Sequence, residues 1–210
     1  MTTQDAATRW DQRYRDGDVP WDKRRPEPQL IEQAMALDWP APLAVDLGCG
    51  TGDNAMALAE RGSDVIGLDI SETVIATARQ RAQAAGLAHV RFICGDALQP
   101  LPIEQPAGLV MDRGCYHVFD ESDRAILAER VANVLTPGGY WIMLCGNADE
   151  ERGEGVEGPP QLTVGQVIYP IERHFALQHL EQTRFTGSDG RATHLAWRVT
   201  LCRRGIELNG

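Results

Sequence analysis

The sequence predicts an α/β fold in which helices cover one open, doubly wound and mostly parallel sheet of seven strands. Two observations support this prediction. Short apolar runs alternate with amphipathic stretches of helical length over residues 43–145, and strict alternation of apolar and polar residues begins near Leu195. The first pattern is typical of parallel strands joined by helices, and the second of an antiparallel pair. We therefore expect a parallel core closed by a C-terminal antiparallel hairpin, with a helical cover at the N-terminus.

The parallel strands are predicted at five apolar runs, which are residues 43–47, 65–69, 90–94, 109–112 and 140–145. Between the second and third runs, Ser71 is a natural helix N-cap and Gly86 a natural left-handed exit, which predicts a helix. Another helix is predicted at residues 122–135, before the Pro-Gly-Gly sequence at 137–139 turns the chain into the fifth strand.

The segments outside this core also carry patterns. Residues 175–180 and 195–202, separated by a Gly-Ser-Asp-Gly turn sequence, predict the hairpin. Residues 146–160 are acidic and rich in glycine and proline, so we expect a mobile surface loop beside the site. The first forty residues are typical of two short helices that flank a proline-rich connection. We predict one domain over residues 1–210, divided into an N-terminal helical lid (1–40), a core (41–145), a mobile loop (146–162) and a C-terminal helix and hairpin (163–210).

Composition excludes several classes of partner. The chain has 20 basic and 30 acidic residues, and its net charge of −10 repels nucleic acid and anionic membranes. No apolar stretch reaches the roughly 18 residues that span a bilayer, and the N-terminus lacks the layout of a signal peptide, so we expect a cytoplasmic protein. The sequence does not decide between a monomer and a homodimer.

The five cysteines are scattered and contain no C-x-x-C pair, which indicates free thiols and no metal site. Four of them fall near the C-terminal ends of predicted strands, where open α/β sheets place their ligands, and we expect some of them to line a pocket. They are Cys49, Cys94, Cys115 and Cys145.

A glycine loop at residues 45–52 follows a buried strand and opens a helix, which is the context of a nucleotide-type binding loop. A plain tight turn is the alternative, but three glycines at alternate positions favour a close approach of the backbone to a ligand. The dinucleotide pattern G-x-G-x-x-G requires glycine where this chain has Asp53. A carboxylate there opposes a pyrophosphate and suits a cofactor that carries ammonium and sulfonium groups.

Two further acids extend this site. Asp69 ends the second predicted strand, where a carboxylate accepts hydrogen bonds from both hydroxyls of a ribose. Asp96 follows the third strand and is placed to accept from an adenine amino group. Each acid is alternatively a helix cap or a turn former.

This set of motifs resembles the class I S-adenosylmethionine-dependent methyltransferases over about residues 43–145, together with the sequence Leu-Thr-Pro-Gly-Gly at 135–139. The resemblance implies a Rossmann-like fold and S-adenosyl-L-methionine as the cofactor. It also implies contacts to three parts of this cofactor. The implied residues are Asp46, Gly48, Gly50 and Gly52 for the methionine portion, Asp69 for the ribose, and Asp96 with Ala97 for the adenine. Ile70, next to Asp69, is also expected to contact the cofactor.

Three other segments resemble the thiopurine, thiol and halide methyltransferase branch. They are the N-terminal stretch with Trp10, Tyr14 and Trp21, the sequence Asp-Arg-Gly at 112–114, and Gly-Pro-Pro at 158–160. The aromatic residues are predicted to close over the cofactor, because aromatic faces attract a sulfonium; they alternatively only pin the arm to the core. The third segment is implied to border the substrate cavity. A shorter chain and Cys-Tyr-His at 115–117 depart from the thiopurine enzymes.

Methyl transfer requires alignment of a nucleophile with the cofactor and exclusion of water. Arg113 is predicted to hold a carboxylate on cofactor or substrate and to lower the pKa of a bound thiol; alternatively it forms a salt bridge with Asp112 or another acid. For a hydroxyl or amine acceptor, His117 or Asp112 is the candidate base, although His117 is alternatively structural. The predicted catalytic set is therefore Asp112, Arg113 and His117.

The leading hypothesis is thus a methyltransferase acting on a small-molecule thiol. An O- or N-methyltransferase of a small metabolite is the alternative. A non-catalytic protein that binds S-adenosylmethionine and an NAD-dependent oxidoreductase are more distant alternatives.

Overall fold

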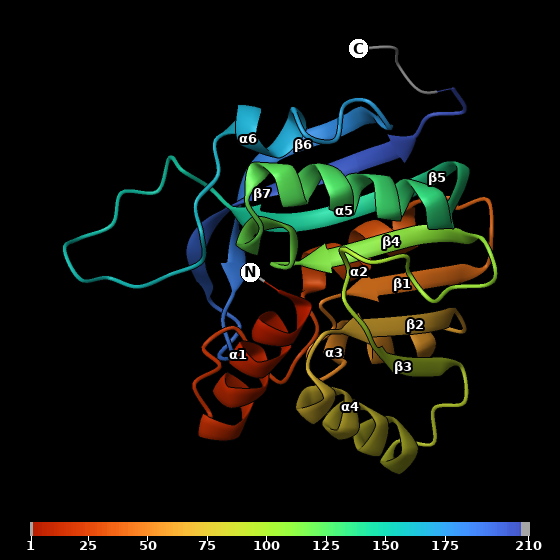
Figure 1. Ribbon diagram of the computed structural model, residues 1–210, viewed down its shortest axis with the longest axis horizontal. Coiled ribbons are helices and arrows are strands. Elements are labelled where there is room, and N and C mark those ends of the chain that lie inside the picture. The colour runs from red at the N-terminus through yellow and green to blue at the C-terminus, as the bar shows by residue number, and fades with distance from the viewer. Residues whose placement is uncertain (1, 207–210) are drawn as a thin grey trace.

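The computed structural model describes residues 2–206 and contains one seven-stranded sheet with helices on both faces (Figure 1). The strand order is β3-β2-β1-β4-β5-β7-β6, in which only the pairs that involve β7 are antiparallel. The strands are β1 (Leu43–Leu47), β2 (Asp64–Asp69), β3 (Val90–Cys94), β4 (Ala107–Arg113), β5 (Leu135–Gly146), β6 (Phe175–Thr186) and β7 (Ala192–Arg203). The predicted fold class is confirmed. The order reverses between β1 and β4, and such a switch point is where open α/β sheets bind ligands.

The helices divide between two apolar cores, one on each face of the sheet. On one face, the side chains of α2 (Pro28–Ala36), α3 (Asp53–Ala59) and α4 (Glu72–Ala84) pack on the sheet. On the other face lie α5 (Glu121–Val134) and the short α6 (Val164–Ile168), and Figure 1 shows α5 in front of the strands. All five residues of β1 are buried, as expected for a central strand covered on both faces.

Most elements lie where local sequence signals predicted them. β1 and β3 have the predicted bounds, and α4 begins after Ser71, whose side chain accepts from the backbone N–H of Val74 at 3.3 Å. Gly86 follows the helix at φ +68°. The C-terminal hairpin is also confirmed, with β6 and β7 longer than their apolar runs because their ladder continues to the pair Thr186–Ala192.

The start of the fifth strand is different from the prediction. β5 begins at Leu135, and the Pro-Gly-Gly sequence lies inside the strand instead of before it. The pairing register shifts between Ala107 and Leu109 of β4, and Gly138 adopts φ +80°. A glycine in this conformation lets a strand bulge without leaving the sheet.

The N-terminal segment forms the two predicted short helices, α1 (Thr3–Asp16) and α2. α1 has no buried residue of its own, and it lies beside α4 at the edge where the parallel strands end (Figure 1). Residues 147–162 form the predicted loop, which extends away from the sheet in Figure 1 and contains an isolated bridge between Asn147 and Leu162. Among residues 2–206, no helix combines the length and apolar character needed to cross a bilayer.

Candidate functional site

The glycine loop connects β1 to α3 at the switch point. Gly48, Gly50 and Gly52 have φ values of +62°, +53° and +86°, a region that only glycine adopts without strain. A Cβ atom on Gly48 would lie 2.8 Å from the Cβ of Cys115, and one on Gly52 would lie 2.5 Å from the ring of Phe92. Backbone conformation therefore favours glycine at all three positions, and packing against Cys115 and Phe92 also requires it at Gly48 and Gly52, which the sequence pattern did not reveal.

Two acids flank this loop, one partly exposed and one buried. Asp69 accepts hydrogen bonds from the N–H of Gly50 through Oδ2 and from the N–H of Ser71 through Oδ1, both at 3.0 Å, so it ties the loop to the end of β2. Asp46 is 1% exposed, and its Oδ2 has no hydrogen-bond partner in the described chain. Burial, together with the charge of nearby Asp112, raises the pKa of Asp46 well above its usual value. The unsatisfied oxygen of Asp46 fits an ammonium group such as that of a methionine moiety.

The predicted adenine-binding residues lie at the next strand end. Asp96 accepts from the hydroxyl of Thr3 at 2.6 Å and from the N–H of Leu98 at 2.9 Å. Ala97 is buried and Ile70 is partly exposed. The first turn of α1 thus rests on the residue that the sequence assigns to the adenine.

The aromatic residues of the cover form one cluster above the glycine loop. The rings of Trp10 and Trp21 meet edge to face with centroids 5.3 Å apart, and Trp21 Nε1 donates to the Tyr14 hydroxyl at 3.2 Å. This hydroxyl lies 3.1 Å from the position of a Cβ on Gly50. The guanidinium of Arg13 stacks over Trp21 at 4.2 Å, so this ring already contacts a cation within the protein.

Asp53 does not offer a free charge to a ligand. Its carboxylate pairs with Arg81 at 2.6 Å and accepts from the Thr51 hydroxyl at 3.0 Å. The argument from the charge of Asp53 is therefore wrong, because a partner from α4 neutralises this carboxylate. The spacing argument is unaffected.

Asp112 ends β4 as a fully buried side chain. Its Oδ1 accepts from the N–H of Cys115 at 2.7 Å and its Oδ2 from the N–H of Tyr116 at 2.8 Å. Burial raises the pKa of Asp112 to about 7. Because both oxygens accept hydrogen bonds from backbone N–H groups, the geometry favours a structural role for Asp112 in the turn after β4 over the role of a base.

Arg113 forms a salt bridge, and its partner is Glu27 instead of Asp112. Arg113 Nε donates to Glu27 Oε2 at 3.0 Å, and the Glu27 side chain is completely buried. Glu27 also accepts from the N–H of Thr186 at 3.1 Å and from its hydroxyl at 2.5 Å. Arg113 further donates to the carbonyl oxygens of Trp21 and Thr186, and it lies over the ring of Phe185. This cluster joins the cover, the end of β4 and the end of β6.

Sequence reasoning did not find Glu27. It lies between two prolines, directly before α2, and gives that helix no side-chain cap. A glutamate at the N-cap position of a helix, where Ser, Thr, Asp or Asn is preferred, is a local signal. Nothing local indicates its partner, which lies 86 residues away.

His117 is buried and neutral. Burial, followed by the positive charges of Arg113 and Arg152, lowers its pKa to about 3. Its Nδ1 accepts the N–H of Gly146 at 2.9 Å, which places the imidazole proton on Nε2. His117 is therefore arranged as a hydrogen-bond donor, and the structural alternative fits its contacts better than the role of a base.

The cysteines are free thiols in the part of the chain described. Burial raises the pKa of Cys49 and of Cys115, so both are protonated at neutral pH. Cys115 touches Gly48 and so connects the turn after β4 to the glycine loop. Within residues 2–206, no group of three His, Cys, Asp or Glu side chains is arranged to hold a metal ion.

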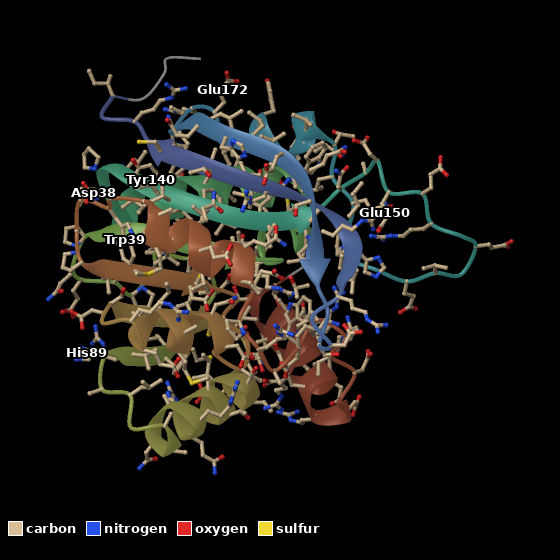
Figure 2. The ribbon with its side chains drawn as sticks, turned by 180° about the vertical axis from the view of Figure 1, so that it is seen from behind. Asp38, Trp39, His89, Tyr140, Glu150 and Glu172 are labelled. Carbon is tan, nitrogen blue, oxygen red and sulfur yellow. The ribbon has the colours of Figure 1, made fainter. Side chains whose placement is uncertain are left out.

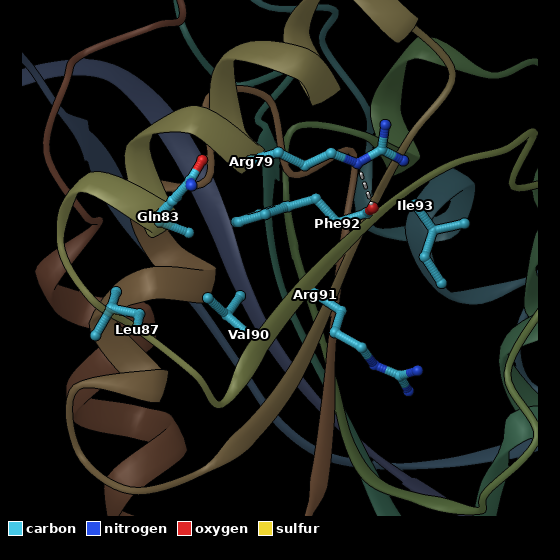
Figure 3. A pocket seen from close by; sticks show the side chains of 8 residues that line it. Arg79, Gln83, Leu87, Val90, Arg91, Phe92 and Ile93 are labelled. Atoms are coloured by element: carbon cyan, nitrogen blue, oxygen red, sulfur yellow. Dashed lines mark hydrogen bonds between the residues drawn. The ribbon is translucent and has the colours of Figure 1, made fainter.

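A separate pocket of about 560 Å³ lies outside this site, along α4 and β3 (Figure 3). Arg79 crosses it to donate to the carbonyl oxygen of Phe92 at 3.0 Å, and Leu87 and Val90 form its apolar wall. None of the predicted site residues lines it, so it is not part of the candidate site.

Comparisons with known proteins agree with this geometry. A family model described as a methyltransferase domain matches residues 44–139, which include the glycine loop, Asp69, Asp96 and the end of β4. A solved structure of the glycopeptide N-methyltransferase MtfA with S-adenosylmethionine superimposes with a TM-score of 0.68 at 18% identity, covering 86% of this chain and 88% of that one. The chain is a class I S-adenosylmethionine-dependent methyltransferase, and S-adenosylmethionine is its cofactor.

Among individual proteins, the chain is similar to a probable thiol methyltransferase 2 from Arabidopsis thaliana. The two are 29% identical over 161 residues, which cover 76% of this chain and 69% of the relative. It is also similar to a 2-heptyl-1-hydroxyquinolin-4(1H)-one methyltransferase from Mycobacteroides abscessus, at 25% identity over 175 residues, 81% of this chain and 75% of the relative.

Proposed function

We propose that this methyltransferase acts on a small-molecule thiol. The observation that carries the proposal is the similarity to a probable thiol methyltransferase 2, at 29% identity over 161 residues. A bound thiol reacts as its thiolate, which a nearby cation stabilises. Arg113 and Arg152 are the cations closest to this role, because both contribute to the lowered pKa of His117 at the turn after β4.

A thiolate acceptor needs no base from the protein. The cofactor supplies an activated methyl group, and the chain aligns the nucleophile and excludes water. Asp112 and His117 suit this task, because Asp112 holds the turn after β4 and His117 is fixed on Gly146. We propose that Arg113 mainly holds the cover against the ends of β4 and β6, since Glu27 and two carbonyl oxygens occupy its donors.

The cofactor contacts expected from the sequence are part of this proposal. The unpaired oxygen of Asp46 supports a contact to the methionine amino group, and the position of Asp69 beside the loop supports the ribose role. The aromatic cluster above Gly50 supports the proposal that α1 and the segment after it act as a lid. One continuous sheet from Leu43 to Arg203 supports a single domain. A cytoplasmic location is proposed from composition alone.

Transfer to a hydroxyl is the second candidate. The relative from Mycobacteroides abscessus favours it, because its name gives a 1-hydroxyquinolinone as the compound that it methylates. The name of the Arabidopsis relative favours a thiol. The higher identity to the Arabidopsis relative, 29% against 25%, leads us to rank the thiol first.

A screen of thiols, phenols, amines and iodide with labelled S-adenosylmethionine tests the proposal. We expect the highest kcat/KM for a thiol, with a rate that follows the thiolate fraction as pH rises. A higher kcat/KM for a phenol or an amine would show that the acceptor class is wrong.

A further inference from the structure

Arg152 has a buried hydrogen-bond donor without a partner. It lies in the loop of residues 147–162, its side chain is 16% exposed, and its Nε donates to Glu150 Oε2 at 2.7 Å. Its Nη2 is buried and has no hydrogen-bond partner among residues 2–206. Leaving a charged donor buried and unpaired is unfavourable, so such a group indicates a missing acceptor.

Gly158 and His194 pack closely around this guanidinium. A Cβ on Gly158 would lie 2.7 Å from Cζ of Arg152, 3.0 Å from its Nη1 and 2.9 Å from Cε1 of His194. Gly158 belongs to the Gly-Pro-Pro segment that the sequence singled out, and its lack of a side chain makes room for Arg152. The glycine therefore leaves the space that the guanidinium occupies.

This position is connected to the end of β4. Pro160 packs against Gly146, where a Cβ would lie 2.1 Å from the Pro160 carbonyl oxygen, and Gly146 donates to His117. The charge of Arg152 reaches His117, because it contributes to the lowered pKa of that imidazole. Arg152 is thus linked, through Gly158, Pro160 and Gly146, to the turn after β4.

The acid that faces Arg152 does not satisfy it. Glu150 lies near the base of the loop, beside the hairpin (Figure 2). Its Oε1 accepts from the N–H of Leu195 at 2.7 Å, and its Oε2 is shared between Arg152 and His194 Nδ1. Arg184 lies 4.0 Å from Oε1. One carboxylate is therefore divided among several donors, and Nη2 of Arg152 still lacks an acceptor.

We propose that Arg152 determines acceptor specificity by binding a carboxylate of the methyl acceptor. The planar edge of a guanidinium matches the two oxygens of a carboxylate, while the nucleophilic atom of the same molecule faces the methyl donor. This inference rests on the proposed function in that the acceptor is a small molecule, but it does not require the reacting atom to be sulfur.

The test compares acceptors that differ only in charge. We would measure kcat and KM with 3-mercaptopropionate and its amide, and with 4-hydroxybenzoate and its amide, for the wild type, Arg152→Gln and Arg152→Lys. We expect the wild type to prefer the acid, and Arg152→Gln to raise KM for the acid at least about tenfold while KM for the amide changes less than about twofold. Arg152→Lys should recover part of the loss. Arg184→Gln is the matched control, because it removes a half-exposed positive charge near Glu150 and leaves the edge of Arg152 intact.

The outcomes separate this inference from the proposed function. If only the phenol pair is methylated, the thiol proposal is wrong and the comparison of acid with amide still tests Arg152. If neither pair reacts, calorimetry on the wild type with S-adenosylhomocysteine decides: tighter binding of 3-mercaptopropionate than of its amide supports the inference, and equal binding overturns it. The same measurement applies if a variant does not fold. Equal losses for acid and amide in Arg152→Gln would also overturn it.

Discussion

The ion pair between Glu27 and Arg113 gives a prediction whose size follows from the structure. The Glu27 side chain is 0% exposed and that of Arg113 is 15% exposed, so Glu27→Ala leaves the guanidinium largely buried without a counter-charge. Removing one partner of a buried ion pair costs about 3–5 kcal/mol. At about 2–4 °C per kcal/mol for a chain of this length, the melting temperature should fall by roughly 6–20 °C.

Thermal and urea unfolding followed by circular dichroism measure this loss. Glu72→Gln is the matched control, because its pair with Arg79 is half exposed and should contribute less than about 1 kcal/mol. Glu27→Ala/Arg113→Ala should lose much less than the sum of the two single variants, since no isolated charge remains. If Glu27→Ala unfolds within about 1 kcal/mol of the wild type, the pair does not hold the cover, β4 and β6 together, and our reasoning on it is refuted.

Three other predictions concern the cofactor loop and His117. Asp69→Ala should weaken S-adenosylmethionine binding about ten- to hundredfold, as measured by calorimetry. Asp64→Ala, at the exposed start of the same strand, is the control and should bind as tightly as the wild type. An affinity of Asp69→Ala equal to that of Asp64→Ala would contradict the ribose role. Gly48→Ala should destabilise the fold by about 1–3 kcal/mol, because φ is +62° and the new Cβ meets Cys115; adding Cys115→Gly should restore only part of this, and full restoration would show that φ contributes nothing. The folded state keeps His117 neutral down to about pH 3 while the unfolded state takes up a proton below about pH 6.5, so the contribution of His117 to stability should fall with decreasing pH between these values by up to about 1.4 kcal/mol per unit. The raised pKa of Asp112 acts in the opposite direction, so this contribution is measured as the difference in slope between the wild type and His117→Gln. His117→Gln should lack this slope, and an unchanged slope would contradict the assignment.

Elements with local signals were predicted well from the sequence. β1 and β3 are short apolar runs, and α4 is marked by Ser71 and Gly86, so their bounds depend on residues a few positions apart. The start of β5 was missed, because the Pro-Gly-Gly sequence is compatible with a turn and with a bulge. Pairing with β4 selects the bulge.

The sequence by itself determined the fold class and the methyl donor. The glycine loop and the acids after successive strands are local motifs at strand ends, and a parallel sheet brings such ends to one edge. Only the tertiary structure decided which of these charges remain available to a ligand. Arg81 neutralises Asp53, and Glu27 occupies Arg113, across separations of 28 and 86 residues. Burial and pairing depend on contacts between distant segments, and for that reason the donor of Arg152 and the neutral His117 emerge only in the folded chain.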